Sequence, residues 1–290
     1  MQRNPLRLVE ALGMLSLFSA VPWSHARADV PQPYEAFAIQ TGTALEEAGK
    51  NFQFAVAANR DLFVVKQSDT GTNSTEVHVL SAASGYQNFS VHTGTPLEES
   101  GSEYVFLVSG SSDVFAIKKS GTASEKTELF VLSAKSQYTE IALHTATALH
   151  ETGSSFEFQL APNDDLFAIK KSDTGSGSTE VHVLTAASGY KQFSVQTGTA
   201  LKETGSGTTF LLARNGDILV LDKRETESNT TEVQVLSAAD NYQTLSSSDA
   251  TALHETDSAF AFSLAYNRDI FAIKKRDTGS ESTEVHVLRY

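Results

Sequence analysis

The sequence is built from a unit that recurs every 52 residues without insertion or deletion. A Thr-Glu pair opens the same apolar segment in five places: Thr75-Glu76, Thr127-Glu128, Thr179-Glu180, Thr231-Glu232 and Thr283-Glu284. An aspartate and a tyrosine keep the same interval: Asp61, Asp113, Asp165, Asp217 and Asp269; Tyr34, Tyr86, Tyr138, Tyr190 and Tyr242. A fixed period of this size indicates one supersecondary unit copied along the chain. The repeat therefore constrains the fold more than any single residue does.

One copy of the repeat predicts four β-strands. Residues 156–160 alternate apolar and polar, which is the period of a strand, and 166–170 form a short apolar run typical of a buried strand. Residues 180–184 alternate again, and 190–196 supply a fourth strand. Tight turns and a loop rich in Gly, Ser and Thr separate these segments, and no stretch shows a helical period.

Four consecutive antiparallel strands in about 50 residues are typical of a propeller blade, and copies of a blade must stack around an axis. The first element, 34–41, matches a fourth strand, whereas the last, 284–288, matches a third strand. We therefore predict an all-β fold over 34–290: a five-bladed β-propeller of four-stranded repeats, in which an N-terminal outer strand completes the last blade. This closure removes an exposed sheet edge. A β-trefoil needs three copies and a β-helix needs shorter turns, so neither fits.

The N-terminus predicts a signal peptide over residues 1–28. Arg3 and Arg7 precede an apolar stretch over 11–23, and Ala26-Arg27-Ala28 matches a small-x-small cleavage signal. We expect cleavage after Ala28, a short lead-in over 29–33, and a secreted, periplasmic or extracellular protein. Nothing later in the sequence is apolar for long enough to predict a membrane helix.

Composition excludes several classes of function. The chain has 22 basic and 35 acidic residues, and without the three Arg and one Glu of 1–28 it carries 19 and 34, a net charge of −15. Such a surface repels phosphate backbones and anionic lipids, so we expect neither nucleic-acid binding nor membrane binding. The absence of cysteine excludes thiol catalysis and cysteine-ligated metals. The repeats are long enough to bury a core without disulfides.

The blade pattern over 34–290 resembles the lectin-type β-propellers, and the five-bladed tachylectin type is similar in blade number. Trp-Asp repeat signatures and the Ser-x-Asp-x-Gly-x-Thr-Trp box of sialidases are absent, and the single tryptophan is Trp23. The resemblance implies a multivalent carbohydrate-binding protein.

Polar residues that recur in the longer loops and at the start of the third strand are the candidate ligand-binding residues. These loops should share one face of the ring, and recognition residues often lie on loops held by a rigid scaffold. The candidates are Glu47, Glu99, Glu151, Glu203 and Glu255; Glu76, Glu128, Glu180, Glu232 and Glu284; and Lys119, Lys171, Lys223 and Lys275. Two interpretations stay open. The side chains either tie loops and strands together within each blade, or form equivalent pockets that bind sugar hydroxyls.

The sequence predicts no catalytic centre, no metal and no cofactor. His78, His182 and His286 share one position, but Phe130 and Gln234 replace them elsewhere, which indicates space filling more than ligation. Three Asp-Thr-Gly triplets, beginning at Asp69, Asp173 and Asp277, spell an aspartic-protease signature, yet they recur in equivalent loops, where we expect Asp to cap and Gly to bend the turn. Calcium in these loops is a remote alternative, since alternating acidic residues are missing.

The sequence therefore favours a secreted, non-catalytic binding propeller, monomeric, with glycans as ligands. The alternative is a propeller that binds a protein surface or is purely structural. A glycosidase-like activity is less favoured, because catalytic acids and bases need unequal environments whereas these carboxylates are copies of one another. The fourth copy differs from the rest at Thr208, Asp222 and Gln234, so we expect its site to be the weakest or a specialised one.

Overall fold

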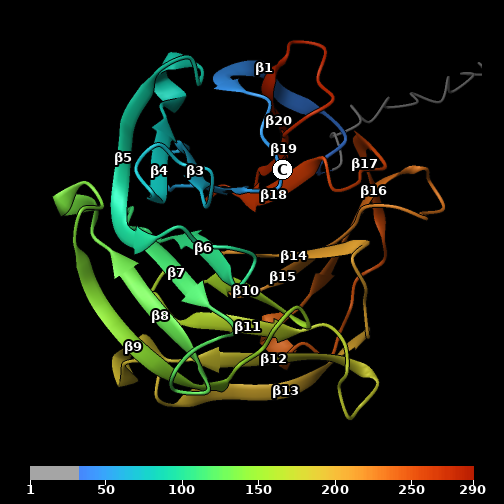
Figure 1. The fold of residues 1–290 in the computed structure, drawn as a ribbon. Coiled ribbons are helices and arrows are strands. Elements are labelled where there is room, and N and C mark those ends of the chain that lie inside the picture. The colour runs from blue at the N-terminus through green and yellow to red at the C-terminus, as the bar shows by residue number, and fades with distance from the viewer. Residues whose placement is uncertain (1–32) are drawn as a thin grey trace, which may run out of the picture. The chain divides into compact units, whose positions relative to one another are not determined.

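A computed structural model describes residues 33–290 and places them in five four-stranded antiparallel sheets (Figure 1). The predicted signal peptide, its cleavage site and residues 29–32 lie outside the described residues. The all-β five-bladed propeller is thus confirmed. No helix in the described part of the chain has the length and apolar character needed to cross a membrane.

Each blade runs from an inner strand to an outer one. The first has β2 (Phe52–Val56), β3 (Leu62–Lys66), β4 (Ser74–Leu80) and β5 (Phe89–Glu98). The second has β6 (Tyr104–Val108), β7 (Val114–Lys118), β8 (Lys126–Leu132) and β9 (Ile141–His150). The third has β10 (Phe156–Leu160), β11 (Leu166–Lys170), β12 (Ser178–Leu184) and β13 (Phe193–Lys202). The fourth has β14 (Thr208–Leu212), β15 (Ile218–Asp222), β16 (Thr230–Leu236) and β17 (Asp249–His254). The fifth has β18 (Phe260–Leu264), β19 (Ile270–Lys274), β20 (Ser282–Leu288) and, from the N-terminus, β1 (Phe37–Glu46).

The ring closes as the sequence predicts. β1 pairs antiparallel with β20, and Thr41 lies opposite Val285. The backbone N–H of Tyr34 donates to the carbonyl of Arg289 at 2.6 Å, and the carbonyl of Tyr34 accepts from the N–H of Ala252 in the fourth blade at 2.9 Å. Each inner strand packs beside the next around the axis, and β18 packs beside β2. The N-terminal segment therefore connects the fifth blade to the fourth as well as completing it.

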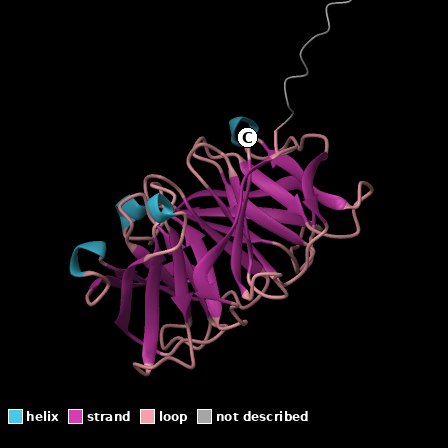
Figure 2. Ribbon diagram, turned by 90° about the horizontal axis from the view of Figure 1, so that it is seen from above, coloured by secondary structure: helices cyan, strands magenta, loops and turns pink. Residues whose placement is uncertain are grey.

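The predicted boundaries of the outer strand were wrong. In the third blade it begins at Phe193 and extends to Lys202, whereas the sequence predicts 190–196. The chain first passes through a 3-10 turn, η3 (Ala186–Ser188), and Tyr190 then takes a left-handed φ of 65°. Such a backbone cannot continue a strand, so pairing starts later. Four such turns, η1 (Ala82–Ser84), η2 (Ala134–Ser136), η3 and η4 (Ala238–Asp240), lie along one face of the propeller (Figure 2).

The invariant aspartates and tyrosines hold this turn in place. Asp165 Oδ1 accepts the N–H of Ala186 at 2.7 Å, and the Tyr190 hydroxyl donates to the carbonyl of Asp164 at 3.1 Å. The same aspartate contact recurs from Asp61 to Ala82, Asp113 to Ala134, Asp217 to Ala238 and Asp269 to Tyr290. All five tyrosines are buried, as expected for packing side chains. The two most regular features of the repeat are thus structural.

The hydrophobic core is divided into layers between neighbouring blades. Between the fifth and first blades, Phe271 and Val285 pack against Val64 and Leu80. Equivalent layers fill the other four junctions. The mid-strand phenylalanines, represented by Phe63, are buried in these layers.

Candidate functional site

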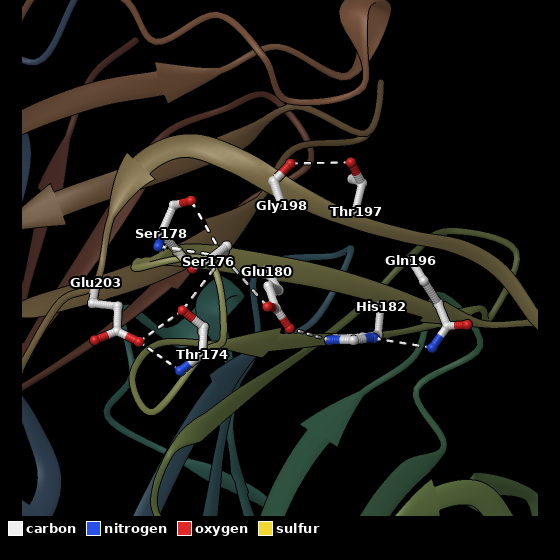
Figure 3. A network of polar contacts seen from close by, with 9 residues as sticks. All are labelled: Thr174, Ser176, Ser178, Glu180, His182, Gln196, Thr197, Gly198 and Glu203. Atoms are coloured by element: carbon white, nitrogen blue, oxygen red, sulfur yellow. Dashed lines mark hydrogen bonds and ion pairs between the residues drawn. The ribbon is translucent and has the colours of Figure 1, made fainter.

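The recurring glutamates that follow the outer strands hold the long loop of their own blade. In the third blade, Glu203 Oε1 accepts both the backbone N–H and the hydroxyl of Thr174, at 2.5 and 2.7 Å (Figure 3). The same two bonds join Glu47 to Thr278, Glu99 to Thr70, Glu151 to Thr122 and Glu255 to Thr226. We call each pair a Glu–Thr clasp. These five candidate residues therefore have an intrablade structural role.

Because of the Glu–Thr clasps, we expect the folded protein to lose stability in acid. Hydrogen bonds from Thr174 lower the pKa of Glu203 below its usual range. A carboxyl whose pKa is lowered by folding contributes stability above its unfolded pKa and loses it as the pH falls through the folded pKa. We expect Glu203→Gln to flatten the fall of melting temperature below about pH 4.3, the ordinary pKa of Glu. Thr174→Val keeps the amide donor and should give an intermediate slope. A Glu203→Gln curve that overlays the parent curve would contradict this role.

The glutamates that open the third strands lie on a different surface, the blade face that looks toward the preceding blade. Glu180 Oε1 is 3.4 Å from Ser176 Oγ in the loop before it, and Oε2 is 3.3 Å from Nε2 of His182 (Figure 3). Glu76, Glu128, Glu232 and Glu284 likewise accept from a Thr or Ser hydroxyl four residues earlier in the chain. One carboxylate oxygen thus holds the loop, and the other faces the strand surface.

The candidate lysines lie elsewhere, just after the second strand of four blades. Lys171 Nζ is 3.5 Å from Glu157 Oε2 on the inner strand β10. Burial lowers the pKa of Lys119, Lys223 and Lys275, and nearby cations lower it further, with Lys171 acting on both Lys119 and Lys223. The lysines of successive blades are therefore neighbours of each other. The structure does not join them with the two sets of glutamates into five equal pockets.

The fourth blade has a pocket at the position where the other four copies of the repeat carry an aromatic ring. A pocket of about 720 Å³ opens on the face of the fourth blade. Its polar lining includes Thr208, Asp222, Arg224, Glu232, Gln234 and Ser248. In the third blade the equivalent space holds Phe156, whose ring centroid is 5.9 Å from that of His182. The first and second blades add a lysine over the ring, with Lys66 Nζ 5.9 Å from Phe52 and Lys118 Nζ 5.8 Å from Tyr104.

The sequence of the fourth copy explains the pocket. Thr208, Asp222 and Gln234 replace the aromatic ring, the lysine and the histidine, so three large side chains are lost from one surface. The outer strand is also shorter, because β17 begins only at Asp249 and Ser246 to Ser248 lie outside it. The pocket and the substitutions of the fourth copy therefore lie at the same place in the structure.

The pocket presents fixed acceptors and donors to a ligand. Thr208 Oγ1 donates to Asp222 Oδ1 at 2.8 Å, and Asp222 lies directly opposite Glu232 in the sheet. Glu232 accepts from Ser248 at 2.6 Å and from Ser228 at 2.8 Å, and these bonds lower its pKa, so it is ionised at neutral pH. Arg224 and Ser206 also line the pocket, and Arg224 donates to Ser206 at 2.7 Å. Such groups suit a ligand with many hydroxyl groups.

The Asp-Thr-Gly triplets are turn elements, as the sequence predicts. Asp69, Asp173 and Asp277 take the left-handed conformation, with φ of 55–57°, and the glycines two residues later lie at bends or turns without a left-handed φ. Asp tolerates this region better than most residues because its short side chain can bond locally. The intervening threonine belongs to the clasp.

Comparison with known proteins identifies no family. No family model matches the sequence, and no curated protein sequence matches it. Among solved structures, the chain is similar to the catalytic domain of a GH62 α-L-arabinofuranosidase from Coprinopsis cinerea, with 6% identity over 88% of this chain and 98% of that one and a TM-score of 0.49. It is also similar to an exo-β-1,3-galactanase from Phanerochaete chrysosporium, with 10% identity over 85% of this chain and a TM-score of 0.48; there it spans 63% of the other chain, less than two thirds.

Proposed function

We propose that this protein is a non-catalytic carbohydrate-binding propeller whose main site is the pocket of the fourth blade. The observation that carries the proposal is the replacement, in this blade alone, of the aromatic, lysine and histidine stack by Thr208, Asp222 and Gln234. A volume of about 720 Å³ lies within the range of ligand pockets, which runs from about 300 to 1,000 Å³.

The charge of the pocket narrows the ligand class. Asp222, Glu225, Glu227 and Glu232 line it together with one cation, Arg224. Anionic sugars would be repelled, whereas neutral saccharides are accepted and a protonated amino group would gain attraction to the carboxylates. The proposed ligand is therefore a neutral saccharide or an amino sugar of a few rings. This interpretation replaces five equal sites with one specialised site, because the Glu–Thr clasps occupy the recurring loop carboxylates.

A glycan array probed with the full chain is the direct test. We expect binding to neutral or amino-sugar glycans and none to sulfated or sialylated ones, with retention that weakens as salt rises for the amino sugars. Asp222→Asn should weaken binding of amino sugars about tenfold or more, because a charge-assisted hydrogen bond becomes a neutral one. The matched control is Lys170→Gln at the equivalent position of the third blade, which should leave binding unchanged.

Failure of this test has a defined meaning. If no neutral, amino or anionic glycan binds, the carbohydrate-binding proposal is overturned. The remaining alternative is a propeller that binds a protein or is purely structural. Release of reducing ends from a bound oligosaccharide would instead show that Asp222 and Glu232 act as catalytic acids, against the non-catalytic proposal.

A further inference from the structure

The first blade differs from its neighbours at a second pair of positions. Across β4 and β5, His78 lies opposite His92. The same two positions hold His182 and Gln196 in the third blade, and His286 and Gln40 in the fifth. The second blade has Phe130 with His144, and the fourth has Gln234 with Ser248. Only the first copy of the repeat therefore places two histidines beside the glutamate that opens the third strand.

The three side chains of the first blade are close enough to share one ion. Ligand atoms of Glu76, His78 and His92 all lie within 4.8 Å of one another, and no other group of three such residues does so in the part of the chain that the structure describes. His78 Nε2 is 3.3 Å from Glu76 Oε2. Two ligands that each lie about 2.1 Å from a tetrahedral zinc ion are about 3.4 Å apart, so this pair is already spaced for coordination.

His78 lacks the partners that its equivalents have. In the third and fifth blades a glutamine amide lies 3.4 and 3.2 Å from Nδ1 of the histidine. In the first blade His92 replaces that amide, and the two imidazole rings lie 4.2 Å apart between centroids. The side chain of His78 is 8% exposed, and its Nδ1 has no hydrogen-bond partner. Its Nε2 lies 3.3 Å from Glu76 Oε2, as Nε2 of His182 and His286 lies 3.3 Å from the equivalent glutamates. A buried Nδ1 without a partner needs an explanation, since leaving a polar atom unsatisfied costs free energy.

The surrounding groups prepare the cluster for a cation. Glu76 Oε1 accepts from the Thr72 hydroxyl at 3.0 Å, which orients the carboxylate and leaves Oε2 free for an ion. His92 is exposed, so the cluster is reachable from solvent.

We infer that Glu76, His78 and His92 form a binding site for a divalent first-row transition metal such as Zn²⁺. Two imidazoles and a carboxylate suit such ions, whereas Ca²⁺ and Mg²⁺ prefer oxygen ligands alone. Three protein ligands leave a coordination position for water or for a ligand group. The site lies in the first blade and does not depend on the saccharide pocket of the fourth.

Zinc titration of the full chain without a histidine tag tests the site. We expect one Zn²⁺ per chain by calorimetry and a higher melting temperature in its presence, since an ion that binds only the folded state stabilises it. His92→Gln recreates the pair found in the third and fifth blades, so the metal-free protein should keep its melting temperature. Its zinc affinity should fall at least about 100-fold, because even the loss of an outer-shell partner costs about 10- to 100-fold.

The repeat supplies a gain-of-function control. Gln196→His places a second histidine opposite His182 and beside Glu180, and should raise the stoichiometry from one ion to two. Ca²⁺ should produce neither heat nor a thermal shift that depends on His92. The inference is overturned if the original chain binds no Zn²⁺, or if His92→Gln binds it with the same affinity and stoichiometry, which would place the zinc on surface carboxylates.

Discussion

Deletion of residues 33–46 should lower the melting temperature of this protein by at least about 10 °C and make it associate through an exposed strand. These residues include all of β1, whose pairing with β20 closes the ring. They also include Tyr34, which is 4% exposed and whose hydroxyl donates to the carbonyl of Arg268 at 3.1 Å. Loss of one buried aromatic side chain costs about 3–5 kcal/mol, and each kcal/mol corresponds to about 2–4 °C in a domain of this size. The lost strand pairing adds to this cost.

The deletion has a specific rescue. A synthetic peptide of residues 33–46 should bind the freed edge of β20 in trans, because a strand added to an open edge recovers the backbone hydrogen bonds. We expect it to restore the melting temperature and the monomer, while a peptide of the same composition in scrambled order does neither. A deleted chain that stays monomeric and melts within about 2 °C of the parent would show that the ring does not depend on this closure.

The architecture could be predicted because the repeat encodes it redundantly. Each blade carries the same alternation of apolar residues, so five copies report one strand pattern. The offset between the element at 34–41 and the one at 284–288 then defines how the ends meet. The register of the outer strand could not be predicted. It depends on the left-handed turn that ends at Tyr190, and the tyrosine side chain does not predict a positive φ. The outer strand was consequently placed three residues too early and ended too soon.

The same error hid parts of the candidate site. His92 was not considered beside His78, because their pairing follows from the true register of β4 and β5. The recurring loop glutamates were left between a structural and a binding role, since a sequence cannot show that Glu203 reaches Thr174 across 29 positions. The three exchanges of the fourth copy were visible in the sequence. The sequence did not show that these exchanges leave one pocket, because this depends on the three positions lying on the same face of the sheet.

Filling the fourth blade should abolish saccharide binding without harming the fold. The triple variant Thr208→Phe, Asp222→Lys and Gln234→His restores the side chains that occupy this space in the third and fifth blades. We expect at least a 100-fold loss of affinity, about 2.7 kcal/mol, for the saccharide that binds best in the array, measured by calorimetry. The melting temperature should stay the same or rise, because an aromatic ring fills space that is now polar and open.

The reverse exchange in the third blade is the matched control, and it distinguishes a site from a scaffold effect. Phe156→Thr, Lys170→Asp and His182→Gln should open an equivalent cavity on a surface where Glu180 stands in the place of Glu232. If the pocket chemistry alone recognises the ligand, this variant should bind a second equivalent weakly. In the third blade Val195 and Gln196 stand in place of Ser247 and Ser248, and the longer outer strand β13 is retained. If the triple variant of the fourth blade still binds the saccharide with unchanged affinity, the ligand contacts another surface. The three exchanges in this copy would then have removed a stacked aromatic side chain without creating a binding site.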